Sequence, residues 1–94
     1  EEAAQVEVLR RRLLGVITAR HYVMLDYDVP AARVDAACAI TPGLESPTVS
    51  NLQNRDWCAV RAMVPRSGTN AVMDELYDLG ARAILVTDIT ACRL

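Results

Sequence analysis

The 94 residues suffice for one domain with a single modest core, because a chain of this size buries only about 60–65% of its unfolded surface. A composition with 52% hydrophobic and 23% charged residues is that of an ordinary globular protein and excludes a disordered chain. The net charge of -2 gives no electrostatic footprint for nucleic acid or an anionic membrane, and no apolar run approaches the roughly 20 residues of a membrane span. We therefore expect a cytoplasmic protein that binds neither nucleic acid nor a membrane.

The number and spacing of the cysteines agree with a cytoplasmic protein. Three cysteines are an odd number, and they show no CxxC spacing, which argues against a disulfide framework and against a zinc site. Reduced thiols are typical of the cytoplasm. The chain begins with Glu1 rather than Met, and we expect it to be a fragment of a longer protein.

The first half of the chain predicts a helix, a strand, a short helix and a loop. Apolar residues at helical spacing indicate an amphipathic helix over residues 3–17, with Arg10, Arg11 and Arg12 on its polar side: Val6, Leu9, Leu13, Val16 and Ile17. Residues 22–29 alternate with period two and predict a strand. Pro30 fixes φ where a second helix can begin, over about residues 30–40. Two prolines and a glycine within residues 41–47 indicate a loop of defined shape.

The second half predicts a hairpin, a third helix and a last strand. Strands over residues 48–52 and 57–64 flank a polar tetrad, and a helix with N-cap residues within 67–70 ends at Gly80. Residues 83–89 form the closing strand. After the leading helix the order is βαββαβ, which predicts an α+β, ferredoxin-like fold with a four-stranded antiparallel sheet and two helices on one face.

One face of that sheet is expected to be apolar and to lie opposite the two helices that cover the other face. If the small residues of the strand over 57–64 face the helices, the opposite face carries these side chains: Trp57, Ala59, Met63, Tyr22, Met24 and Leu85. Such a face is too apolar to remain in water. Either the leading helix folds back over it or another subunit covers it, and we favour a subunit, because ferredoxin-like domains often associate through their sheets.

The sequence offers few combinations of residues that could carry out catalysis. His21 is the one histidine, and Cys58, its conceivable nucleophile partner, falls on the core side of its strand, where thiols are usually inert. Asp26 and Asp28 share one strand face, as paired carboxylates of an acid/base or metal site do, but no third oxygen donor lies nearby. We expect no catalytic residue and no metal.

A binding site for a small zwitterion is a second interpretation of Asp28. The rigid loop over residues 41–48 presents fixed backbone groups and the hydroxyls of Ser46 and Thr48, while the carboxylate of Asp28 suits a ligand cation. The alternative is that Asp28 caps the helix at Pro30 and the loop is only a tight connection. Composition alone favours that alternative.

The run Ala39-Ile40-Thr41-Pro42-Gly43-Leu44-Glu45-Ser46-Pro47-Thr48 resembles the C-terminal regulatory domain of long-form ATP phosphoribosyltransferase, the first enzyme of histidine biosynthesis. Further segments are similar in order and spacing, so the resemblance covers about residues 13–94: 22–28, 57–65, 73–76 and 80–85.

The resemblance implies a linker helix over residues 1–18 and a ferredoxin-like regulatory domain over 19–94, which binds L-histidine as feedback inhibitor and favours an inhibited hexamer. Carried over by position, the histidine site would consist of Asp28, Leu44, Ser46, Thr48, Met63 and Ala83. The two catalytic lobes of that glycosyltransferase, and the Mg²⁺ they would use, have no counterpart in this sequence, so we expect no enzymatic activity and no cofactor. The alternative is a stand-alone ferredoxin-like module that only assembles a homo-oligomer or binds a partner.

Overall fold

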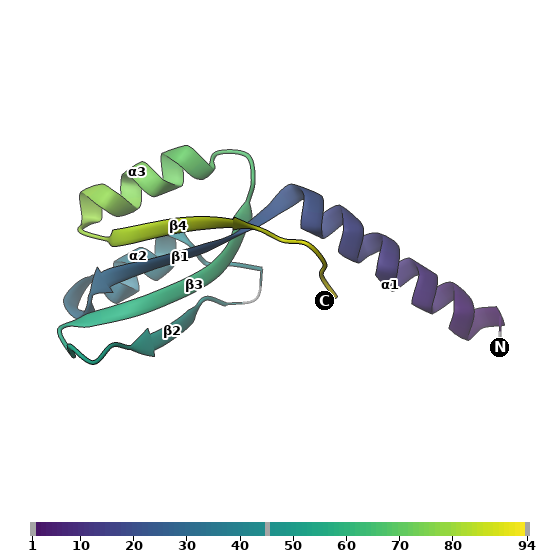
Figure 1. The fold of residues 1–94 in the computed structure, drawn as a ribbon, viewed down its shortest axis with the longest axis horizontal. Helices are drawn as coiled ribbons and strands as arrows, with labels where there is room; N and C mark the ends of the chain where they lie inside the picture. The colour runs from purple at the N-terminus through teal and green to yellow at the C-terminus, as the bar shows by residue number, and fades with distance from the viewer. Residues whose placement is uncertain (1, 45, 94) are drawn as a thin grey trace.

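The computed structural model of the chain describes residues 2–44 and 46–93 and contains a four-stranded sheet with α2 and α3 on one face (Figure 1). In chain order the elements are α1 (Glu2–His21), β1 (Tyr22–Pro30), the 3-10 turn η1 (Ala31–Arg33), α2 (Val34–Ile40), β2 (Thr48–Asn51), β3 (Trp57–Pro65), α3 (Thr69–Leu79) and β4 (Arg82–Asp88). The strand order is β2-β3-β1-β4, and each neighbouring pair is antiparallel. The predicted α+β, ferredoxin-like fold is confirmed.

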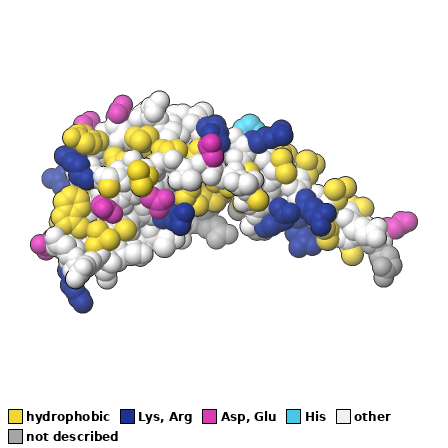
Figure 2. Space-filling model, in the orientation of Figure 1, with side chains coloured by type: hydrophobic (Ala, Val, Ile, Leu, Met, Phe, Trp, Pro, Cys, Tyr) yellow, Lys and Arg dark blue, Asp and Glu magenta, His cyan; other side chains and the backbone are white. Residues whose placement is uncertain are grey.

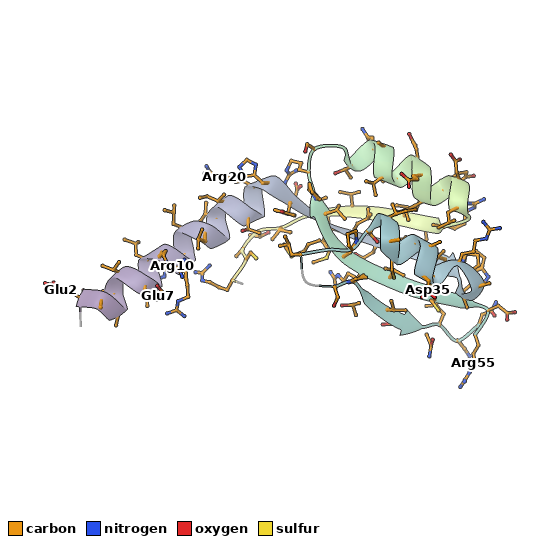
Figure 3. All side chains as sticks on the ribbon, turned by 180° about the vertical axis from the view of Figure 1, so that it is seen from behind. Glu2, Glu7, Arg10, Arg20, Asp35 and Arg55 are labelled. Carbon is orange, nitrogen blue, oxygen red and sulfur yellow. The ribbon has the colours of Figure 1, made fainter. Side chains whose placement is uncertain are left out.

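β1 is a central strand, and its alternation divides the sheet into a core face and an open face. Every second residue of β1 is buried and pairs with a buried residue of β3: Val23 with Val64, Leu25 with Ala62, Tyr27 with Val60 and Val29 with Cys58. The helices α2 and α3 cover this core face, where Ala37 and Leu76 are fully buried (Figure 3). The predicted helix-facing set of small apolar residues on β3 is therefore confirmed.

The start of α2 differs from the sequence prediction, whereas that of α3 agrees with it. Pro30 does not begin a helix, because its ψ of 135° is extended, and η1 precedes α2. At α3 the N-cap is Gly68, within the predicted residues 67–70, but it has no side-chain cap. The hydroxyl of Thr69 lies 2.7 Å from the carbonyl oxygen of Arg66 and 3.0 Å from that of Pro65, and it donates back to this turn. The end of α3 is as predicted, since Gly80 has a φ of 114°, in the left-handed region that glycine adopts without a steric penalty.

The leading helix α1 is longer than predicted and points away from the sheet, which gives the molecule extents of 53 × 25 × 19 Å (Figure 1). Its apolar stripe faces solvent, with Val6 and Leu9 exposed to 65% and 66%. Figure 2 shows hydrophobic and basic side chains side by side along this helix. The alternative that α1 folds back over the open face is therefore wrong, and the favoured alternative, a second chain as cover, stays a prediction.

Two contacts fix the C-terminal half of α1 to the domain. Arg66 donates to the carbonyl oxygen of Arg20 and to the carboxylate of Asp88, each at 2.9 Å, which joins the end of α1 to the end of β4. The segment after β4 crosses α1 at the buried Gly15, where a β-carbon would overlap the carbonyl oxygen of Cys92. The first half of α1 projects into solvent (Figure 1).

A buried polar pair links the core to the loop that follows α2. The hydroxyls of Tyr27 and Thr41, both buried, lie 2.7 Å apart. Because the Thr41 hydroxyl donates its one proton to the carbonyl oxygen of Ala37 at 3.3 Å, the Tyr27 hydroxyl is the donor to Thr41. Burial raises the pKa of Tyr27, and the hydrogen bond to Thr41 opposes this more weakly. The neutral Tyr27 hydroxyl thus holds the first residue of the loop in place.

We expect Thr41→Val to lower the free energy of unfolding by about 1–3 kcal/mol, because it leaves the buried Tyr27 hydroxyl without a partner. The double variant Tyr27→Phe/Thr41→Val should recover most of this loss, since neither hydroxyl then remains. Urea unfolding followed by Trp57 fluorescence measures both variants. A double variant that is no more stable than Thr41→Val would contradict the pairing.

Candidate functional site

The open face is the side of the sheet turned away from α2 and α3. Strand alternation and register place the following residues there: Tyr22, Met24, Asp26, Asp28, Thr48, Ser50, Trp57, Ala59, Arg61, Met63, Ala83, Leu85 and Thr87. All six apolar residues predicted for this face are among them. Figure 2 shows hydrophobic and charged side chains mixed over the sheet. The face therefore combines apolar and charged side chains, as a site for a small polar ligand does.

Two adjoining hollows mark the open face. The first, of about 450 Å³, has these residues among its lining: Asp26, Asp28, Thr48, Ser50, Arg61, Ala83 and Leu85. The second, of about 320 Å³, has these: Met24, Leu44, Ser46, Thr48, Arg61, Met63 and Arg93. Both volumes fall within the roughly 300–1,000 Å³ of small-molecule sites. Thr48 and Arg61 line both hollows and form the boundary between them.

The six residues predicted to bind a ligand all reach these hollows, but they divide between them. Asp28 and Ala83 line the first hollow. The second hollow takes Leu44, Ser46 and Met63, and Thr48 belongs to both. Within residues 2–44 and 46–93, neither hollow gathers all six side chains.

Asp28 brings an uncompensated carboxylate to the first hollow. It is half-buried, and the ion pairs formed within the described part of the chain do not involve it. Its neighbour on β4, Arg82, turns away, because its guanidinium stacks 4.0 Å from the centroid of the Tyr77 ring and donates to the Tyr77 carbonyl at 3.1 Å. Neither η1 nor α2 has a side-chain cap, so the alternative that Asp28 caps the helix at Pro30 is wrong.

Ala83 lies at an irregular point of the sheet beside Asp28. The β1–β4 register shifts between Asp26 and Asp28, and Ala83 has a φ of 54°, in the left-handed region. That conformation costs a residue other than glycine about 1–2 kcal/mol. Bulges of this kind are over-represented near functional sites, where they re-aim a side chain. Here the irregularity brings Ala83 to the lining of the first hollow.

The loop between α2 and β2 brings Leu44 and Ser46 to the second hollow. Thr41 anchors its start to the core through Tyr27. Gly43 has a φ of 73°, which favours glycine, and a β-carbon there would lie 3.5 Å from the backbone of Ser46. Residue 45 of the predicted loop lies outside the described residues. The predicted constrained loop thus has a buried anchor and a glycine-dependent turn.

The residue pair that sequence reasoning missed is Asp26 and Arg61. The sequence pattern offers Asp26 only as a possible partner of Asp28 in a carboxylate pair. In the structure its Oδ1 lies 3.4 Å from Nε of Arg61, its cross-strand partner on β3. The signal was available, because Arg61 is the one charged residue in the otherwise apolar alternation over 57–64. Where the structure describes the chain, no group of three or more His, Cys, Asp or Glu side chains gathers as a metal site would.

Cys58 and His21 do not form a nucleophile–base pair. His21 precedes Tyr22, while Cys58 pairs with Val29 at the far end of β1, roughly 26 Å away. Cys58 is 6% exposed, and its Sγ lies 3.9 Å from Oδ1 of Asn51. The prediction of a buried structural thiol is confirmed.

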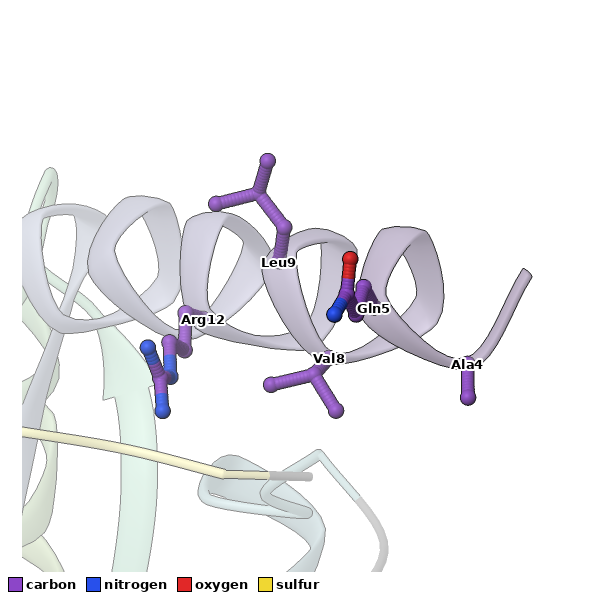
Figure 4. Close-up of a pocket in the computed structure, with 5 residues that line it drawn as sticks. All are labelled: Ala4, Gln5, Val8, Leu9 and Arg12. Atoms are coloured by element: carbon purple, nitrogen blue, oxygen red, sulfur yellow. The ribbon is translucent and has the colours of Figure 1, made fainter. Parts of the chain in front are cut away.

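A further hollow lies on α1 alone. It is lined by Ala4, Gln5, Val8, Leu9 and Arg12, and Figure 4 shows that these side chains diverge around one exposed helix. Without a second element to close it, this hollow does not make a ligand site. As far as the described residues go, the protein has no helix with the length and apolarity to span a membrane.

Comparison with known proteins identifies the family. The family described as HisG, C-terminal domain, matches residues 19–91. The chain belongs to this family. ATP phosphoribosyltransferase of Arthrobacter sp. (strain FB24) is 63% identical over 92 residues, which cover 98% of the chain and 32% of the relative. The enzyme of the same name from Bifidobacterium longum (strain NCC 2705) is 52% identical over 94 residues, 100% of the chain and 33% of the relative.

Membership in the HisG C-terminal domain family confirms the resemblance stated from the sequence. The chain spans about a third of the length of the curated relatives it matches. The family match begins at residue 19, near the end of α1, whereas the relatives also match most or all of that helix. Both α1 and the ferredoxin-like part are thus shared with ATP phosphoribosyltransferases.

Proposed function

We propose that the chain is the regulatory domain of an ATP phosphoribosyltransferase and binds L-histidine, as feedback inhibitor, on the open face of its sheet. The observation that carries this proposal is the half-buried carboxylate of Asp28, which lines a hollow and has no ion-pair partner among the described residues. Histidine offers an α-ammonium group and an imidazole that can be protonated. Either group supplies the missing cation through a charge-assisted hydrogen bond.

The other candidate residues supply the remaining contacts in this proposal. Main-chain groups around Leu44, Ser46 and Thr48, together with the two hydroxyls, form hydrogen bonds to the ligand. Met63 and Ala83 give apolar contact to its side chain. The buried anchor at the start of the loop supports this role, because fixed donors and acceptors lose less entropy on binding than mobile ones do.

A second copy of the chain is proposed to complete the site. The six residues lie in two adjoining hollows open to solvent, and the surrounding face carries exposed apolar groups such as Leu85, 62% exposed. A copy packed on this face would enclose the ligand and exclude water, which strengthens its polar contacts. Histidine would then favour one arrangement of domains and, in the longer enzyme, a less active hexamer.

In this proposal the chain itself has no catalytic role. The transfer reaction and its Mg²⁺ belong to the remainder of a longer cytoplasmic glycosyltransferase. The helix α1 is the covalent route to that remainder, and its contacts with Arg66 and Cys92 join it to the domain. An inhibitor bound at the sheet can act on distant lobes only if its affinity differs between two states of the assembly.

A second candidate function is assembly without an amino-acid ligand. The observation in its favour is the exposure of apolar residues on the edge strands, with Val49 at 46%, Leu85 at 62% and Val86 at 41%. Apolar groups in this position favour association whether or not a ligand is present. This candidate predicts an oligomer whose mass does not depend on histidine.

We expect Asp28→Asn to weaken binding of L-histidine by about tenfold or more, since a charge-assisted hydrogen bond contributes about 1.5–3 kcal/mol. Calorimetric titration of the 94-residue chain measures the affinity. Asp35→Asn is the matched control, because Asp35 is exposed on α2, on the side of the sheet opposite the open face (Figure 3). An Asp28→Asn variant that binds as tightly as the parent chain would remove Asp28 from the site.

We further expect the chain to form a homo-oligomer through the open face, and Leu85→Ser to weaken it, because the substitution removes exposed apolar surface from the contact. Light scattering over a range of protein concentrations, with and without L-histidine, gives the mass. A monomeric mass at high concentration in both conditions would contradict the proposed assembly.

A further inference from the structure

Arg61 occupies the centre of the open face. It pairs with Asp26 on β1 and with Thr48 on β2, so two neighbouring strands flank it. Its side chain lines both hollows, which only Thr48 also does. Arg61 is therefore within reach of a ligand that lies across the boundary between the two hollows.

That guanidinium has unused donors. Its one ion pair is the 3.4 Å approach of Nε to Oδ1 of Asp26, on a side chain that is 60% exposed. Neither Nη of Arg61 forms a hydrogen bond with the described residues. Exposed single-contact pairs of this kind contribute little to stability. The two Nη groups thus remain available as a fork that fits a carboxylate.

The other cation of the second hollow is already engaged. Arg93 lines this hollow, but its Nη1 donates to the carbonyl oxygen of Cys92 at 2.9 Å. Arg82, near the first hollow, is held on Tyr77. Of the arginines around the two hollows, Arg61 is the one whose Nη groups both lack a hydrogen bond to the described residues.

We propose that Arg61 holds the carboxylate of the amino-acid ligand and determines that the site takes an amino acid rather than an amine. Asp28 lies on the same face, two residues along β1 from Asp26, or roughly 7 Å. Arg61 lies directly opposite Asp26 on β3 and is therefore the diagonal cross-strand neighbour of Asp28, at roughly 7–8 Å. The face thus presents a carboxylate for the ligand cation and a guanidinium for the ligand carboxylate on adjacent strands. This assignment rests on the proposed histidine site and adds the group that recognises the second charge.

The test compares L-histidine with histamine, which keeps the imidazole and the amine but lacks the carboxylate. Calorimetric titrations use the 94-residue chain, Arg61→Gln, Arg61→Lys and the matched control Arg55→Gln. Arg55 lies at the tip of the β2–β3 turn (Figure 3). We expect the parent chain and the control to prefer L-histidine by at least about tenfold, and Arg61→Gln to lose about ten- to a hundredfold in affinity for L-histidine without a change for histamine. Arg61→Lys, which keeps the charge but not the fork, should bind L-histidine with an affinity between those of the parent chain and Arg61→Gln.

Four results would overturn the assignment. An Arg61→Gln variant that retains the parent affinity for L-histidine would contradict it. A variant that binds both ligands more weakly by the same factor would also contradict it, because a general disturbance of the face has that effect. A parent chain that binds both ligands equally well would contradict the role of Arg61 and leave the histidine site standing. A parent chain that binds neither ligand would overturn both proposals.

Discussion

The register of β1 is the constraint on which the rest of the structure depends. As a central strand, β1 pairs with β3 on one side and β4 on the other, and its alternation sends Leu25 and Tyr27 into the core while Asp26 and Asp28 face the opposite way. A slip of one residue would bury the two carboxylates and expose the core. The same pairing therefore maintains the fold and presents the candidate site.

The second constraint is the link between that core and the loop. The hydroxyl of Tyr27 reaches Thr41, the first loop residue, inside the protein rather than at its surface. Gly43 then turns the chain so that Leu44 and Ser46 line the second hollow. Because the anchor is buried and satisfied, core packing sets the position of Thr41, where the loop begins.

Much of the fold was predictable because period two and period 3.6 leave clear patterns. The strands at 22–29 and 57–64, the helix that ends at Gly80 and the apolar residues of the open face all follow from residue spacing. The environment of α1 did not follow, because spacing identifies an apolar stripe but not what covers it. The start of α2 also differed, since the 3-10 turn η1 precedes it.

The candidate site was predictable in part. The resemblance supplied six residues, and strand register and the loop bring all six to one face. Their division between two hollows depends on three-dimensional spacing that no linear pattern carries. To predict the Asp26–Arg61 pair, one must know that β1 and β3 are neighbours and in which register they pair. The ferredoxin-like topology already implied that they are neighbours, but not the register.

The central claim is that histidine binds on the open face beside Asp28. An NMR titration of the isotope-labelled chain with L-histidine tests it most directly, because each backbone amide reports its own surroundings. The account predicts shifts confined to the open face and the loop, at Asp28, Ser46, Thr48 and Ala83, while the amides of α2 and α3 stay in place. Shifts centred on α2 or α3, or none at saturating histidine, would contradict it.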